Sequence, residues 1–218
     1  MLRTVTHVPA ARAFLAAWLG WVSLGESIGF LAPVMLQQLG SQAAAGMMLP
    51  LLVLAGLVEG ALLGWSQAHV LKRLLPALSA RRWMLLTSIA AALAWFLGLA
   101  PSEFSQVWIA WPPVLQLGVG FLAGIALLAS IGVAQWLELR RHIPHSWPWI
   151  PGTAAAWSVG LVIFLAISTP LWQPGQPPSL IALIGVFAGI AMAVGMAVVT
   201  GLVLLRIVFS ETGPKSLM

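Results

Sequence analysis

The stretch G-W-S-Q-A-H-V-L-K-R-L-L-P at Gly64 to Pro76 recurs as G-V-A-Q-W-L-E-L-R-R-H-I-P at Gly132 to Pro144. Both copies contain a glycine, a glutamine three residues later, a leucine four beyond that, two adjacent cations, a branched aliphatic residue and a proline. Apolar sequence that ends in paired cations is typical of a membrane helix at its cytoplasmic boundary. The duplication therefore indicates an internal repeat of membrane helices.

The composition is that of an integral membrane protein. Hydrophobic residues make up 61% of the 218 positions and charged residues only 7%, and the mean hydropathy is +1.00. A soluble domain of average usage carries about 25% charged residues. The chain has no cysteine, which excludes disulfides, thiolate metal sites and cysteine nucleophiles.

Six apolar runs approach the length that a spanning helix needs, about 20 residues. Polar or Pro/Gly-rich breaks separate them, and they lie near residues 13–36, 47–71, 83–100, 112–138, 149–170 and 179–207. The predicted fold is an all-α integral membrane protein with six transmembrane helices, in a single domain over residues 1–218.

Lysine and arginine occupy only alternate breaks. The cations of the second and fourth breaks are Lys72, Arg73, Arg81, Arg82, Arg140 and Arg141. The other four precede the first run or follow the last, at Arg3, Arg12, Arg206 and Lys215. Since positive loops are retained in the cytoplasm, both termini are predicted to be cytoplasmic. The basic loops are interpreted as topological markers that reach anionic head groups; the alternative is a docking or phosphate-binding face.

The first apolar run has a second interpretation. Arg3 and Arg12 precede it and the alanines at 43–45 follow it, as in a cleavable signal peptide. Its apolar part is too long for a typical signal core and contains Glu26. A membrane helix is therefore favoured.

The runs also align as three copies of a helical hairpin. From Val22, Thr87 and Thr153 the period is about 65 residues. Small residues recur four apart in the odd-numbered runs, a spacing that lets helices approach closely in lipid: Gly25 and Gly29, Ala90 and Ala94, Ala156 and Gly160. The even-numbered runs align at Gly56, Gly124 and Gly189, and at Arg73, Arg141 and Arg206. Hairpins near 13–76, 77–144 and 145–208, with a tail over 209–218, predict a pseudo-threefold bundle.

Two acidic residues break the repeat. Glu26 takes the place of Ala91 and Trp157 in the other copies, and Glu59 takes the place of Leu127 and Met192. Both are predicted near mid-bilayer, where ionisable groups are costly and indicate function. If their faces meet, the two carboxyls could share a proton and form a proton or cation relay. The alternative is that each carboxyl is protonated or hydrogen-bonded and serves packing.

Polar residues also align just inside the predicted cytoplasmic boundary. They are Gln67, Gln135 and Thr200 on the even-numbered runs and Thr87 and Thr153 on the odd-numbered ones. The favoured interpretation is an interhelical seam in which each glutamine bonds the threonine of the following helix. The alternative is that the amides bind a polar head group.

No catalytic constellation or metal site is predicted. His69, His142 and His145 lack the spacing with a carboxylate that indicates zinc. No Ser/His/Asp set, phosphate loop or HExxH pattern stands in a suitable context, so we expect no enzyme. The sequence identifies no cofactor.

Twelve tryptophans accompany a complete lack of tyrosine. Those near the ends of the runs are predicted to form an aromatic belt: Trp18, Trp21, Trp83, Trp108, Trp111, Trp147, Trp149 and Trp172. Trp65, Trp95, Trp136 and Trp157 are predicted to pack inside the bundle or to stack on a hydrophobic ligand.

The segment Q-W-L-E-L-R-R-H-I-P at Gln135 to Pro144, with W-I-P-G-T at Trp149 to Thr153, resembles a pattern in uncharacterised bacterial polytopic membrane proteins. That resemblance implies no activity. Three hairpins in one bundle are also similar in outline to mitochondrial carriers. Their Pro-x-acid-x-x-base signature is missing from the odd-numbered runs, so exchange by that mechanism is not implied.

Two functions fit these observations. The first is a small permease or channel-like protein that uses Glu26 and Glu59 for a proton, a cation or a small solute. The second is an accessory or scaffold subunit of a larger membrane complex that binds lipid, pigment or partner helices. The expected partners are membrane lipid and, for the second function, neighbouring membrane subunits, with no nucleic acid.

Overall fold

The computed structural model describes residues 7–39 and 46–210, and every regular element in these ranges is helical. The elements are α1 (His7–Leu39), α2 (Met48–Leu71), α3 (Ala80–Glu103), α4 (Ser105–Ile109), α5 (Pro113–Leu139), α6 (Trp149–Leu171) and α7 (Pro178–Ser210). Arg3, Lys215, the alanines at 43–45 and most of the predicted tail lie outside the described residues.

Six of these helices are long and apolar enough to cross a membrane, which confirms the predicted all-α multi-pass class. The predicted runs coincide with them, but α1 begins six residues earlier than predicted, at His7 rather than 13. Backbone hydrogen bonding continues a helix past the apolar residues that mark its membrane segment. The short α4 was not predicted, because one helical turn of mostly exposed residues leaves no periodic signal.

Local chemistry explains where several helices begin. Ser79 caps α3, and its hydroxyl accepts a hydrogen bond from the Arg82 backbone N–H at 3.3 Å. Pro113 and Pro178 open α5 and α7 at the first helical position, where proline's missing N–H costs nothing. Gly175, with φ of +82°, allows the tight turn between α6 and α7.

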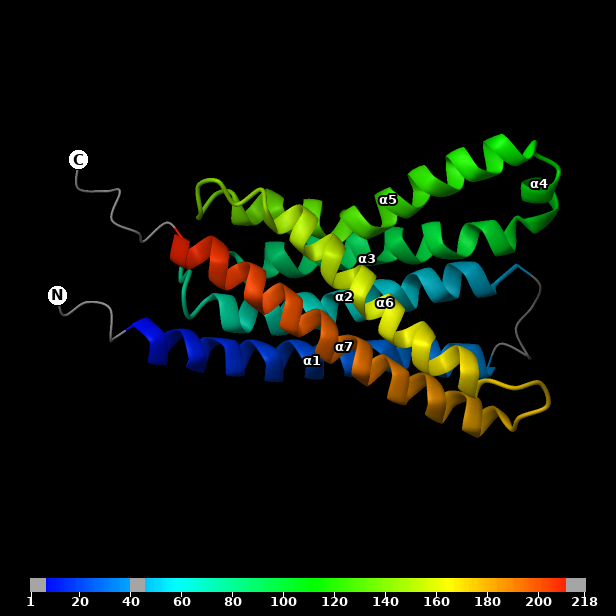
Figure 1. Cartoon of the computed structure of the whole chain (residues 1–218), viewed down its shortest axis with the longest axis horizontal. Coiled ribbons are helices and arrows are strands. Elements are labelled where there is room, and N and C mark those ends of the chain that lie inside the picture. Colours follow the sequence, from blue (N-terminus) through cyan, green and yellow to red (C-terminus); the bar gives the residue numbers. More distant parts are fainter. Residues whose placement is uncertain (1–6, 40–45, 211–218) are drawn as a thin grey trace.

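The long helices form a closed ring (Figure 1). Packed pairs run α1–α2, α2–α3, α3–α5, α5–α6 and α6–α7, and α7 returns to pack on α1. The α2–α3 and α5–α6 loops lie together at one end of the ring, with the start of α1 and the end of α7 (left in Figure 1). We call this the basic end and the opposite end, which carries α4 and the α6–α7 turn, the neutral end.

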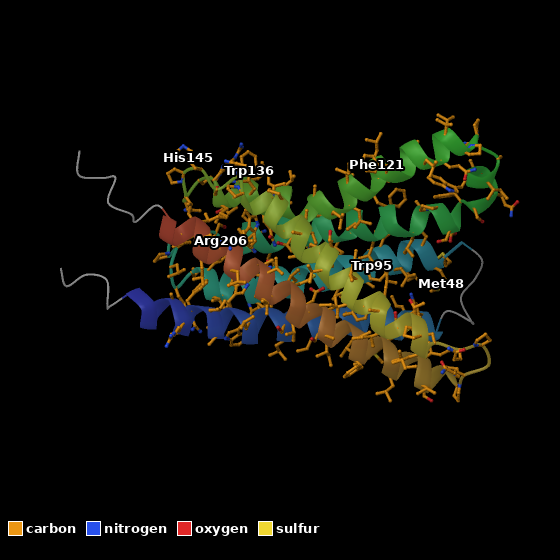
Figure 2. All side chains as sticks on the ribbon, viewed as in Figure 1. Met48, Trp95, Phe121, Trp136, His145 and Arg206 are labelled. Atoms are coloured by element: carbon orange, nitrogen blue, oxygen red, sulfur yellow. The ribbon has the colours of Figure 1, made fainter. Side chains whose placement is uncertain are left out.

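Buried side chains pack the interior of the ring more completely at the basic end than at the neutral end. Most of the largest core cluster lies toward the basic end and includes Trp18, Trp83, Trp149, Leu71 and Leu139. Figure 2 shows Trp136, His145 and Arg206 around this end and Met48 at the other. The bundle is therefore solidly packed at the basic end, and the space left within the ring lies toward the neutral end.

The predicted tryptophan positions need correction. Trp18, Trp83 and Trp149 were assigned to an interfacial belt, but all three are fully buried in the core. Trp65 was assigned to the interior, but it is 49% exposed. Sequence position sets the depth of a residue along a helix; which face carries it depends on the neighbouring helices.

Candidate functional site

A cavity of about 310 Å³ occupies the inside of the ring, and all six long helices line it. Helix α1 supplies Glu26, α2 supplies Glu59, and α3 supplies Ala91; the remaining helices supply Leu127, Trp157 and Met192. The volume is at the lower end of the range for small-molecule sites, about 300–1,000 Å³. The site therefore suits a small solute.

Close packing of α1 on α2 brings the two acidic residues together. Gly29 lies one turn beyond Glu26, and a Cβ on it would stand 2.9 Å from the Glu59 Cα. Only glycine permits this approach. Glu26 and Glu59 therefore lie beside each other at the cavity wall.

The two carboxyls differ in their partners. Glu59 Oε2 accepts a hydrogen bond from the Trp95 indole N–H at 2.7 Å. Glu26 is fully buried, and neither of its oxygens has an N–H or O–H donor in the described structure. Two facing carboxyls can bond each other only when one is protonated, and a buried carboxylate without a partner is costly. Chemically, two neighbouring carboxyls of this kind can hold a proton or a cation.

The rest of the cavity wall is mainly apolar and aromatic. Phe30, Trp95 and Trp157 line it beside the carboxyls, and Phe164 lines it farther toward the neutral end. Phe30 and Phe164 meet edge to face with ring centroids 5.6 Å apart. The wall therefore offers aromatic side chains to an apolar solute next to the acidic pair.

Several residues of the cavity wall are exposed. Gln37 and Trp172 line it at the neutral end, and both are exposed. Leu161 on α6 also lines it and is 37% exposed. Helices α5 and α6 lie together at the basic end and diverge toward the neutral end (Figure 1). Exposed residues of the cavity wall therefore lie both at the neutral end and on the side of α6.

A layer of three tryptophans closes the basic end of the ring. Trp18, Trp83 and Trp149 meet there, with centroid distances of 6.4 Å from Trp18 to Trp149 and 6.2 Å from Trp83 to Trp149. Trp18 lies eight residues before Glu26 on α1, or about 12 Å along the helix. This tryptophan layer separates the carboxyl pair from the basic loops.

Each of these indoles donates a hydrogen bond to a neighbouring helix, which is α2 for Trp83, α5 for Trp149 and α7 for Trp18. Trp83 Nε1 donates to Gln67 Oε1, Trp149 Nε1 to Gln135 Oε1, and Trp18 Nε1 to Thr200 Oγ1, each over 3.1 Å. Sequence reasoning missed this role. The available signal was that Trp18, Trp83 and Trp149 each stand four residues before the repeat markers at 22, 87 and 153.

The predicted polar seam exists with different pairings. Gln135 Nε2 donates to Gln67 Oε1 at 2.6 Å and to Thr87 Oγ1 at 3.0 Å. The expected partner of Gln135 was Thr153 on the following helix, but the Thr153 hydroxyl has no hydrogen-bond partner. The Trp149 indole donates to the Gln135 side-chain carbonyl instead, and the Gln135 amide group donates to Gln67 on α2 and Thr87 on α3.

Glu138 is a further buried acid that sequence reasoning did not single out. Its Oε1 accepts from the Ser79 backbone N–H and lies 3.1 Å from His142 Nε2, and its Oε2 lies 3.3 Å from Arg82 Nε. These contacts join the end of α5 to the start of α3. The sequence signal for this residue was an acid inside the basic repeat segment, at the position that Val70 occupies in the first copy.

The basic loops remain largely at the surface. Lys72, Arg73, Arg81, Arg140 and Arg141 are exposed, as is Arg82 beside Glu138. The Arg140 guanidinium lies 4.7 Å above the Trp136 ring. Within residues 7–39 and 46–210, no group of three or more His, Cys, Asp or Glu side chains could hold a metal ion. His69 instead packs beside Trp21 and Trp65 on the outside of α2.

Comparison with known proteins supplies no further constraint on this site. No protein-family model matches the chain, and searches of curated proteins and of solved structures find no match either.

Proposed function

We propose that this chain is a small permease of a bacterial inner membrane that carries a proton, a cation or a small solute through the ring. The observation that carries the proposal is the cavity lined by all six long helices, with Glu26 and Glu59 side by side at its wall. A buried carboxyl pair that opens toward one end can load a proton or a cation from that side.

The distribution of charge supports an orientation for this permease. The cations of the described loops gather at the basic end, and positive loops are retained in the cytoplasm. With the basic end in the cytoplasm, the cavity opens away from the cytoplasm, and the tryptophan layer is the barrier on the inner side. Release to the inside would require Trp18, Trp83 and Trp149 to separate.

A triplicated hairpin explains why the cavity lies at the centre. The six lining residues Glu26, Ala91, Trp157, Glu59, Leu127 and Met192 occupy two aligned positions of the predicted repeat. The three indole hydrogen bonds also follow the repeat. They join α2 to α3, α5 to α6 and α7 to α1, so each links the second helix of one hairpin to the first helix of the next. We propose a pseudo-threefold axis through the cavity, at which only the first hairpin contributes acids.

The test is flux through purified protein in vesicles. With a pH-sensitive dye inside and a potassium diffusion potential imposed, the wild type is expected to move protons at least about tenfold faster than a Glu26→Gln, Glu59→Gln double variant, because the amides cannot release a proton. Glu103→Gln is the matched control, since Glu103 is exposed outside the cavity. A wild type without flux of protons, alkali cations or small solutes, which also copurifies with stoichiometric membrane partners, would remove the transport proposal.

A second candidate function rests on a separate surface. An apolar groove of about 380 Å³ runs between α3 and α5 on the outside of the ring, and its lining includes Leu86, Ile89, Leu93, Val133 and Leu137. Such a surface fits a neighbouring apolar helix or a lipid chain, as an accessory subunit requires. Purification in mild detergent separates the two functions, because a subunit retains its partners whereas a permease retains lipid only.

A further inference from the structure

We infer that the ligand of the cavity is an organic cation: an ammonium or related centre on a small aromatic or alkyl body. This rests on the proposed function and specifies its solute. The charged centre lies against Glu26 and Glu59, and the apolar body lies against the aromatic wall. A proton occupies the same carboxyl pair when the ligand is absent.

The ligand is inferred to be positively charged because the acidic pair has no cationic partner among the described residues. Glu26 lines the cavity, and both of its carboxyl oxygens are buried without a hydrogen-bond donor. Among the described residues, no lysine, arginine or histidine lines it. Burying a carboxylate requires a compensating charge, and here none comes from the protein. A cation that enters the cavity supplies that charge.

The apolar body follows from the remainder of the wall. A hard inorganic cation such as Ca²⁺ or Mg²⁺ needs about six oxygen ligands, and the wall near the pair offers little beyond two carboxyls. An ammonium or related centre instead binds well over aromatic faces. Trp95 and Trp157 line the cavity next to the carboxyls, and the hydrogen bond from the Trp95 N–H to Glu59 holds that ring in place.

The exposed side of α6 suits a ligand of this kind. Leu161 lines the cavity and is exposed where α5 and α6 diverge. In the membrane this side of the bundle faces lipid. A solute with an apolar body concentrates in the membrane and can enter the cavity there, whereas a strongly hydrated ion must enter at the neutral end.

Equilibrium binding to protein in lipid nanodiscs tests the charge requirement. The probe is radiolabelled benzyltrimethylammonium, and the control is its neutral isostere 2,2-dimethylpropylbenzene, in which carbon replaces the nitrogen. After subtraction of binding to empty nanodiscs, the cation is expected to saturate one site with at least about tenfold higher affinity than the isostere. Equal affinities for the two molecules would overturn the inference.

Variants locate the binding site. Glu26→Gln with Glu59→Gln is expected to weaken cation binding at least about tenfold, while Glu103→Gln leaves it unchanged. Trp157→Leu is expected to weaken cation binding as well, because it removes a ring from the wall. Trp136→Leu changes a tryptophan outside the cavity and is the matched control. Cation binding that survives the double glutamine change would contradict the inferred site.

A measurement on the unaltered protein avoids any effect of the substitutions on folding. A hydrophobic carbodiimide adds to a buried protonated carboxyl, and mass spectrometry locates the adduct. Modification at Glu26 or Glu59 is expected to fall at least about tenfold with saturating benzyltrimethylammonium and to stay constant with the neutral isostere. Protection by both molecules or by neither would count against a cation site.

The two proposals fail in different ways. Proton flux without charge-dependent binding would retain the permease and remove the organic cation. Charge-dependent binding at Glu26 and Glu59 without any flux would retain the cation site and remove transport.

Discussion

At the residue scale, Gln135 connects more helices than any other hydrogen-bonding side chain described above. Its carbonyl accepts from Trp149 on α6, and its amide donates to Gln67 on α2 and Thr87 on α3. It is fully buried on α5. One side chain thus joins four helices beside the tryptophan layer, where the low dielectric makes each unpaired polar group costly.

Replacement of Gln135 by leucine tests this role. Trp149 loses its acceptor, whereas Gln67 keeps its bond from Trp83 and Thr87 keeps its bond to the Trp83 carbonyl. One buried donor is left unpaired, so Gln135→Leu is expected to lower the free energy of unfolding by about 1–3 kcal/mol. The measurement is a denaturation curve in mild detergent. Gln106→Leu, at an exposed position of α4, is expected to change little; equal effects of the two would refute the role.

At the element scale, small residues set the distance between α2 and α3. A Cβ on Gly64 would stand 2.9 Å from both the Met84 Cα and the Thr87 Cβ. Gly60, one turn away, would meet the Ser88 Cα at 2.8 Å. The close approach allows Trp83 to reach Gln67 and Trp95 to reach Glu59. The packing of one helix pair therefore positions both the tryptophan layer and the carboxyl site.

A leucine at Gly64 is expected to separate α2 from α3. Because backbone and Cβ atoms stand in its way, Gly64→Leu should cost about 1–3 kcal/mol or more in stability. Gly124→Leu is the matched control, since a Cβ there meets no atom within 4 Å. Thermal unfolding of the two purified variants gives the comparison. A stable Gly64→Leu protein with an unchanged midpoint would show that α2 and α3 do not pack as described.

At the scale of the whole molecule, the ring is closed at one end and hollow toward the other. Trp18 on α1 and Thr200 on α7 join the two termini of the bundle, and Glu138 joins the loops beside them. At the neutral end, the Trp172 indole donates a hydrogen bond to the Ile181 carbonyl of α7 at 3.2 Å. The first half of α5 is mostly exposed there, from Val114 to Leu122. Rigid packing at one end and a cavity at the other suit loading from one side.

The orientation of the ring is open to direct measurement, because the chain has no cysteine. Gln106→Cys places a thiol in α4 at the neutral end, and Ala77→Cys places one in the α2–α3 loop at the basic end; both positions are exposed. In intact bacterial spheroplasts, a membrane-impermeant maleimide is expected to label Gln106→Cys only. Ala77→Cys should react after the membrane is opened. The reverse pattern would place the basic end outside.

Much of the fold was predictable because the bilayer imposes local rules. A span needs a fixed length of apolar helix, so the six runs predicted the six long helices to within a few residues at most ends. Glu26 and Glu59 could be selected as candidate site residues from the sequence, since acids within an apolar run are costly and rare. Glu138 could not be selected in this way, because it lies beside Arg140 and Arg141 at the predicted end of an apolar run, where charged residues are common.

The amino-acid sequence by itself determined the number of spans, the placement of the cations in alternate breaks and the two acids at mid-span. The tertiary structure alone decided which helices are neighbours, that α7 closes the ring on α1, and that Trp18, Trp83 and Trp149 face its centre. The reason is physical: these helices are apolar all round, so no amphipathic pattern distinguishes the face toward lipid from the face toward protein. Only packing between helices makes that choice, and with it brings Glu26 to Glu59.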